Sequence, residues 1–437
     1  MKNSYASLGE SRPAWFFAPF FTVERIFSAL FLLLGYAFWE CWWQAGRLGG
    51  WMLPLAVFSL LYAGAVLGYV YAQGRRPAGE SWFWLAVLEA VVWSFTMPWA
   101  FSGQGLAQGF GSIFAAVALG AWWAFTACGG LTLGRTSHWL AVDGLCALLL
   151  TPFANFGRLG AGLLSGAGAA LARRKGGRKG FWALFAGLAA GLCLAAMALP
   201  LLTAADQNFR GVFDIFHGPV WQNLGGRLLQ WGFKSLLAIP TALYLFGLAH
   251  GAAHRRPACF FEREGLREFT LSLHAAPTRT IAAALAVPCG LYALFCAFQA
   301  RYLFGAFWGA LPQGFTYAEY ARQGFFELLQ VSFFNGCVLI LAWVAARRTG
   351  RLSVVKALCA ALCCLTLVLL ATAGAKLGLY VAAYGWTLQR VNAAAGLLWL
   401  AGVFCLCLWR LRRPFPLTAL CVWYGAVLYC GLLWVHV

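Results

Sequence analysis

Residues 315–346 read FTYAEYARQGFFELLQVSFFNGCVLILAWVAA, so a polar opening runs directly into a long apolar segment. The apolar part, residues 326–346, has about the 20 residues that an α-helix needs to cross the hydrocarbon core of a bilayer. Apolar runs of similar length recur along the chain. The stretch therefore predicts a membrane protein with charged side chains at the entrance of a transmembrane helix.

The composition of the whole chain agrees with a membrane location. Hydrophobic residues make up 62% of the 437 residues and charged residues only 10%, whereas about a quarter of the residues in a soluble protein are charged. The formal net charge of +19 comes from short basic clusters between the apolar runs, a pattern that orients membrane helices. We therefore expect an all-α fold, a polytopic transmembrane helical bundle in the lipid bilayer, and no nucleic acid partner.

The apolar runs predict about eleven spans in one transmembrane helical domain at 26–437, preceded by a cytoplasmic tail at 1–25. Four spans lie within 26–130 and seven within 181–437. A polar and aromatic link is predicted at 376–389. The predicted spans are 26–44, 51–71, 82–101, 110–130, 181–201, 233–252, 281–300, 326–346, 354–373, 391–409 and 415–435.

A further apolar segment at 139–157 is predicted not to cross. It contains Asp143, Pro152 and Asn155, and basic clusters lie on both sides of it. If the N-terminus is cytoplasmic and this segment is re-entrant or interfacial, 24 of the 32 Lys and Arg residues are cytoplasmic and 8 are outside. This split obeys the positive-inside rule and places the C-terminus outside.

The polar opening is the best candidate for a specific site. The chain has only 13 acidic residues, and Glu319 and Glu327 are two of them. Glu319 can meet Arg322 on one helix face, because the two residues are three positions apart. Such a cluster at a span end fits interfacial anchoring, an ion-pair network between spans, or a ligand site. With its expected neighbours on the outer side, the candidate polar site comprises Arg301, Tyr317, Glu319, Tyr320, Arg322, Glu327, Lys376, Tyr384 and Arg390.

Three other ionisable residues stand out. Glu89 lies deep in the span at 82–101, where a carboxylate must be neutral and hydrogen-bonded or take part in proton or substrate binding. His250 and His254 have a spacing that can bind a metal, but the sequence indicates no third ligand, so no metal site is predicted. We recognise no catalytic or cofactor-binding motif and predict no catalytic residue and no cofactor.

Three segments resemble one known family. They are 317–328 (YAEYARQGFFEL), 301–304 (RYLF) and 379–387 (LYVAAYGWT) with Arg390 behind it. Together they are similar to the signature of multi-pass bacterial membrane proteins catalogued only as a domain of unknown function. The resemblance covers roughly residues 140–437, and the first four spans match less clearly. It implies the bacterial cytoplasmic membrane and no particular activity.

Three functions stay open. The first is a transporter or a lipid- or envelope-handling protein with a small-molecule or lipid substrate, which Glu89 and the outer polar cluster favour. The second is a sensor or scaffold subunit acting through a membrane protein partner. The third, an enzyme using Glu319 and Glu327 as acid and base, is least favoured because no nucleophile or metal accompanies them.

Overall fold

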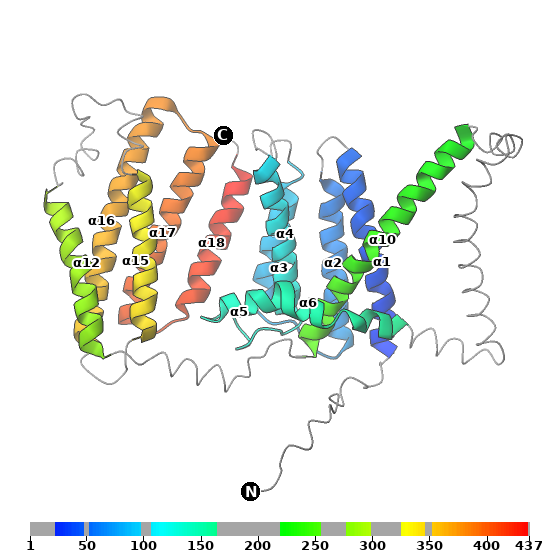
Figure 1. Ribbon diagram of the computed structural model, residues 1–437, viewed down its shortest axis with the longest axis horizontal. Helices are drawn as coiled ribbons and strands as arrows, with labels where there is room; N and C mark the ends of the chain where they lie inside the picture. Colours follow the sequence, from blue (N-terminus) through cyan, green and yellow to red (C-terminus); the bar gives the residue numbers. More distant parts are fainter. Residues whose placement is uncertain are drawn as a thin grey trace, which may run out of the picture. The chain divides into compact units, whose positions relative to one another are not determined.

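The computed structural model describes residues 22–47, 52–97, 106–163, 219–254, 277–298, 325–345 and 352–435. All regular secondary structure in these ranges is helical (Figure 1). The elements are α1 (Thr22–Arg47), α2 (Leu53–Ala72), α3 (Ser81–Ser94), α4 (Leu106–Ala127), α5 (Leu140–Leu145), the π-helix η2 (Cys146–Leu150), α6 (Thr151–Ala154), α10 (Pro219–Ala253), α12 (Thr278–Phe298), α15 (Phe325–Ala345), α16 (Leu352–Tyr384), α17 (Leu388–Arg412) and α18 (Leu417–Trp434).

The helices confirm an integral membrane protein. Within the described residues, 8 helices are long and apolar enough to cross a bilayer, or up to 9 if a bent pair counts as one span. The predicted spans at 82–101 and 110–130 correspond to the shorter apolar helices Ser81–Ser94 and Gly111–Ala127. The predicted span at 181–201 lies outside the described residues. The total of eleven spans therefore stays a prediction.

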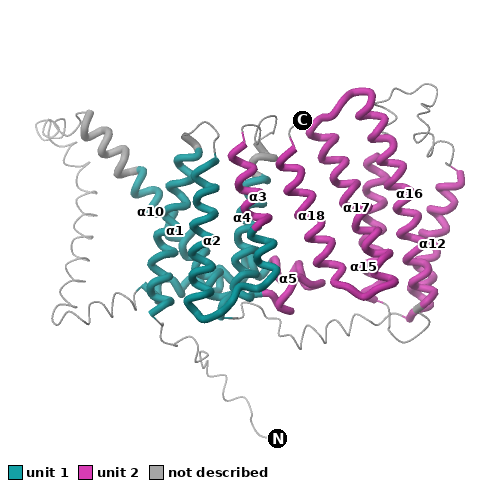
Figure 2. The backbone as a smooth tube through the Cα atoms, turned by 180° about the vertical axis from the view of Figure 1, so that it is seen from behind, with its two compact units in different colours: residues 1–85, 110–130, 145–258 teal, residues 86–109, 131–144, 259–437 magenta. Residues whose placement is uncertain are grey.

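The chain divides into two compact units, shown in different colours in Figure 2. Each unit is assembled from segments that are far apart in the sequence. That 26–437 forms one domain stays a prediction. Unit 1 contains Met1–Leu85, Phe110–Gly130 and Leu145–Ala258, and unit 2 contains Ala86–Gly109, Leu131–Gly144 and Cys259–Val437.

In unit 1, α1 packs against both α2 and α10. The contact with α10 is close because α1 carries a glycine there: a Cβ on Gly35 would lie 2.5 Å from the backbone oxygen of Ala238. One turn further on, the Trp39 indole N–H lies 3.0 Å from both the Leu237 carbonyl and the Thr241 hydroxyl. Higher numbers on α1 meet lower numbers on α10, so the two helices are antiparallel (Figure 1).

The segment predicted not to cross is bent. The helical stretch Leu140–Ala154 meets Gly157–Leu163 at 45°, a geometry found in broken spans and in re-entrant loops. Its second half packs on the C-terminal part of α10, where the Tyr244 hydroxyl donates to the Leu148 carbonyl at 3.0 Å. A Cβ on Gly247 would lie 2.5 Å from the Pro152 carbonyl oxygen, so glycine permits this contact. That the segment does not cross stays a prediction.

In unit 2, α16 packs against α12, α15 and α17, and α17 packs against α18. Leu362, Leu369 and Ala373 of α16 are at most 1% exposed and form the centre of this core. A buried polar contact crosses it, because the Asn335 side-chain amide of α15 donates to the Thr366 hydroxyl of α16 at 3.0 Å.

The predicted link at 376–389 is wrong for most of its length. Helix α16 continues to Tyr384, well beyond the predicted span end at residue 373. Lys376 therefore lies within this helix and not in a link, and its side chain is only 1% exposed. The helix ends at Gly385, whose φ of 76° is the left-handed conformation that commonly follows a helix terminus.

Candidate functional site

The structure describes four of the nine residues of the predicted polar site. Glu327 lies in the first turn of α15, Lys376 and Tyr384 lie on α16, and Arg390 lies on α17. The other five lie outside the described residues, so the predicted cluster stays a prediction as a whole. These five are Arg301, Tyr317, Glu319, Tyr320 and Arg322.

Glu327 and Lys376 are oppositely charged members of the predicted site in unit 2. The two residues lie on neighbouring helices, α15 and α16, and their charges interact. Lys376 is 1% exposed, whereas Glu327 is exposed. A buried ammonium group is costly unless a counter-charge accompanies it. Glu327 supplies negative charge from the adjacent helix, and an ion-pair network between spans stays a prediction.

Arg390 secures the turn between α16 and α17. Its Nη1 donates to the Tyr384 carbonyl at 2.9 Å and to the Gly385 carbonyl. The guanidinium group also lies 4.1 Å from the centre of the Tyr380 ring, in a cation–π contact. A cation at the C-terminal end of α16 is favourable because the helix dipole is negative there.

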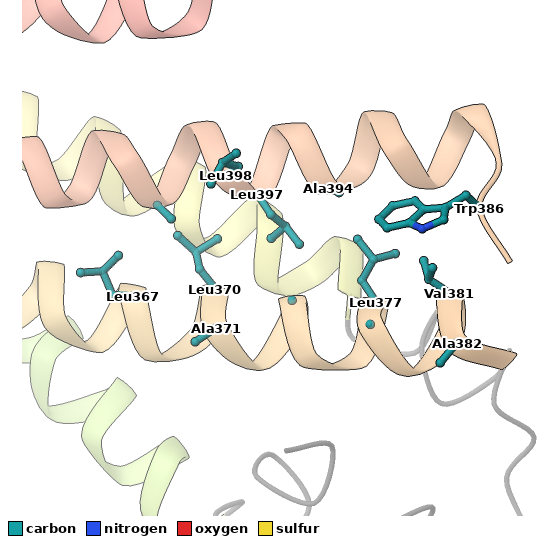
Figure 3. Close-up of a pocket in the computed structure, with 13 residues that line it drawn as sticks. Leu367, Leu370, Ala371, Leu377, Val381, Ala382, Trp386, Ala394, Leu397 and Leu398 are labelled. Atoms are coloured by element: carbon teal, nitrogen blue, oxygen red, sulfur yellow. The ribbon is translucent and has the colours of Figure 1, made fainter. Parts of the chain in front are cut away.

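An apolar groove of about 750 Å³ runs between α16 and α17 (Figure 3). On α16 its lining residues recur every three or four positions, so they form one stripe along the helix. Glycine and alanine create the hollow, since a Cβ on Gly374 or Gly378 would meet nothing within 4 Å. The lining comprises Leu367, Leu370, Ala371, Gly374, Leu377, Gly378, Val381, Ala382, Trp386, Ala394, Leu397, Leu398 and Ala401.

One end of the groove has the features of a membrane interface. Trp386 lines the groove beside the α16–α17 turn and is 56% exposed (Figure 3). Tyr384, 53% exposed, and the cation of Arg390 belong to the same turn. Tryptophan, tyrosine and basic side chains typically lie at the level of lipid headgroups. The groove thus has an apolar body and a basic, aromatic end.

Glu89 lies in α3, where the Trp93 indole N–H donates to its Oε2 at 3.2 Å. The contact joins positions i and i+4 of one helix. The carboxylate is therefore hydrogen-bonded, which fits the interpretation of Glu89 as a hydrogen-bonded side chain without a role in proton or substrate binding. A role in proton or substrate binding stays a prediction.

The structure adds a residue that the sequence interpretation missed. Glu24, in the first turn of α1, lies beside His250 and His254 at the end of α10. The ligand atoms of the three side chains all lie within 4.8 Å of one another. Glu24 and His250 are 226 positions apart, so only the antiparallel packing of α1 and α10 makes them neighbours.

Comparison with known families identifies one match. The profile described as Domain of unknown function (DUF4153) matches residues 87–437, beginning some fifty residues earlier than the resemblance at 140–437. No curated protein and no solved structure matches the chain. Because the profile covers most of the chain, the protein belongs to the family described as Domain of unknown function (DUF4153).

Proposed function

We propose that this protein is a lipid-handling protein of the bacterial cytoplasmic membrane, which holds a lipid acyl chain in the groove between α16 and α17. The groove is the observation that carries the proposal. Its volume of about 750 Å³ is within the range of about 300–1,000 Å³ typical of ligand sites, and its lining is almost wholly apolar. Transport or other handling of the lipid rests on this binding step.

The length of the groove suits a lipid. Residues 367–382 of α16 rise by about 22 Å at 1.5 Å per residue. One leaflet contributes about 15 Å of hydrocarbon, half of a typical bilayer core. An acyl chain with its attached glycerol region therefore fits along α16, with its polar end beside Trp386.

Selectivity must come from the polar end, because lipid tails elsewhere in the bilayer are as apolar as the groove. Arg390 makes its hydrogen bonds to the helix end through Nη1, and a guanidinium group carries five N–H donors in all. An anionic phosphate headgroup matches the charge and the planar donors of this group. The proposed ligand is therefore an anionic phospholipid.

Filling the groove tests this proposal. Gly374→Leu and Gly378→Leu place a side chain in the hollow, where a Cβ at either position meets nothing within 4 Å. Gly396→Leu is the matched control: it changes α17, also meets nothing within 4 Å, and does not line the groove. We expect the two groove variants to lose co-purifying anionic phospholipid, measured by lipid mass spectrometry after detergent exchange, while Gly396→Leu retains it.

The same experiment addresses the second function, a sensor or scaffold subunit acting through a protein partner. Equal lipid content in all three variants contradicts the lipid proposal. Loss of a specific co-purifying membrane protein from the groove variants alone then favours the sensor or scaffold.

Orientation is part of the proposal. We propose that the N-terminus is cytoplasmic and the C-terminus outside, with eleven spans and a non-crossing segment at 139–157. The split of 24 basic residues inside and 8 outside supports this arrangement. It places the α16–α17 turn, and so the polar end of the groove, in the outer leaflet.

A further inference from the structure

Three potential metal ligands meet where α1 begins and α10 ends, within unit 1. The Oε1 atom of Glu24 lies 3.0 Å from Nε2 of His254 and 3.7 Å from Nδ1 of His250. The side chain of His250 is 1% exposed, that of Glu24 8% and that of His254 24%. The cluster is thus nearly closed, with His254 as its exposed member.

The hydrogen bonding of His254 defines which of its nitrogens can bind a cation. Its Nδ1 lies 3.0 Å from the His250 backbone carbonyl, which can only accept, so Nδ1 carries the hydrogen. In the neutral ring Nε2 then has a lone pair, and it faces the Glu24 carboxylate oxygen. Two acceptors at 3.0 Å require a cation between them, either a proton or a metal ion.

The spacing of the ligand atoms agrees with a metal. Zinc bonds of about 2.0–2.1 Å in a tetrahedral arrangement place neighbouring ligand atoms about 3.3 Å apart. The two separations from Glu24 Oε1, 3.0 and 3.7 Å, lie on either side of this value. Two imidazoles and one carboxylate form a ligand set that zinc uses when a fourth position stays open.

The surroundings orient the two imidazoles. Bonding of the second ring nitrogen to a carbonyl, as in His254, is the usual arrangement for a histidine that binds a metal. The Phe246 ring stacks on the His250 ring at 5.5 Å, and the Tyr69 hydroxyl lies 3.1 Å from Nδ1 of His250. This is the nitrogen that faces Glu24, so a metal on Nδ1 has to displace any hydrogen bond that Tyr69 donates to it. Tyr69 is 0% exposed and Phe246 is 0% exposed, so the rings are held by a packed apolar shell.

A polar pocket gives access to the cluster. Its volume is about 500 Å³, and its lining includes His254, Gln73, Arg75 and Arg76. An ion can enter beside His254, and the fourth coordination position can take water or an anion from this pocket. The two arginines favour an anionic fourth ligand, which offsets their repulsion of a metal cation.

We propose that Glu24, His250 and His254 bind a divalent first-row transition metal ion, with zinc as the best chemical match. The site lies in unit 1, whereas the lipid groove lies in unit 2, and the two proposals rest on separate observations. The rival explanation is a proton in place of the metal, which makes His254 an imidazolium paired with Glu24.

The test uses the full chain in detergent, purified with a tag that contains no histidine and stripped of metal by a chelator. Zinc binding is measured by calorimetry for the wild type and for Glu24→Gln and His254→Gln. Glu40→Gln is the matched control, because Glu40 also lies on α1 and bridges to α10 through Lys234, away from the cluster. We expect one zinc ion per wild-type chain, unchanged binding in Glu40→Gln, and at least about tenfold weaker binding in the other two.

Cobalt(II) provides a second measurement that needs no variant. The chain holds 15 cysteines, so zinc bound elsewhere must be distinguished from zinc in the cluster. We expect the visible bands of tetrahedral cobalt without thiolate charge-transfer bands. The proposal is overturned if no zinc binds, if thiolate charge-transfer bands appear, or if all variants bind zinc with equal affinity. These results leave the protonated ion pair.

Discussion

The Nζ atom of Lys234 lies 2.6 Å from Oε2 of Glu40, and this ion pair joins α10 to α1 inside unit 1. The Lys234 side chain is 5% exposed, whereas that of Glu40 is 34% exposed. At the opposite end of the same helix pair, His254 lies 3.0 Å from Glu24. The antiparallel contact of α1 and α10 therefore has a charged or polar bridge at each end and a close glycine contact, at Gly35, in between.

Removal of Glu40 should destabilise unit 1, because it leaves the Lys234 ammonium group buried without its carboxylate. We expect Glu40→Gln to cost less than the about 3–5 kcal/mol of a fully buried pair, since solvent reaches Glu40. The double variant Glu40→Gln, Lys234→Met should cost less than the sum of its single changes. Thermal unfolding in detergent measures this coupling, and strictly additive losses contradict it.

The contact between α10 and α6 depends on glycine. Gly247→Ala should cost about 1–3 kcal/mol, because its Cβ would lie 2.5 Å from the Pro152 carbonyl oxygen and the helices must separate. Gly232→Ala is the control on the same helix: nothing lies within 4 Å of its Cβ, so alanine should be neutral or stabilise by up to about 1 kcal/mol. A comparison of the two melting temperatures checks this; equal shifts would argue against close packing at Gly247.

The buried bond between Asn335 and Thr366 should stabilise the α15–α16 contact. Thr366→Val leaves the Asn335 amide without this acceptor and should cost about 1–3 kcal/mol. Thr372→Val is matched to it, because Thr372 is equally buried and, like Thr366, donates to the carbonyl four residues earlier on α16. A loss no larger than that of Thr372→Val would show that the interhelical bond contributes nothing.

The end of the last helix tests the proposed topology. With eleven spans and a cytoplasmic N-terminus, a reporter enzyme that works only outside the cytoplasmic membrane should be active when fused after Val437. A reporter that works only in the cytoplasm should be inactive at the same position. The reverse pattern contradicts the span count, most simply through a crossing by the segment at 139–157.

Much of the helical arrangement could be predicted from the sequence, because apolar length decides where a helix can cross. The predicted spans 281–300 and 326–346 differ by only a few residues from α12 (Thr278–Phe298) and α15 (Phe325–Ala345). The end of α16 is less predictable, because the charge of Lys376 indicates a link whereas the helix continues to Tyr384 and buries this side chain. Burial of a single cation depends on its neighbours in space, which the sequence of one helix does not contain.

The two sites were less predictable. Nothing in the sequence singles out Gly374 and Gly378, which leave an open groove in the structure. The spacing of His250 and His254 is visible in the sequence, but their third partner, Glu24, falls in the predicted N-terminal tail. Both sites arise from pairs of helices, so local spacing shows only one half of each.

The central claim is that a lipid acyl chain occupies the groove between α16 and α17, and photolabelling tests it most directly. An anionic phospholipid with a photoreactive group in its acyl chain is incorporated into vesicles with the wild-type protein, and labelled peptides are identified by mass spectrometry. We predict labels concentrated at 367–386 and 394–401, reduced in Gly374→Leu and retained in Gly396→Leu. Labels spread evenly over the lipid-facing helices, and unchanged by Gly374→Leu, would contradict the claim.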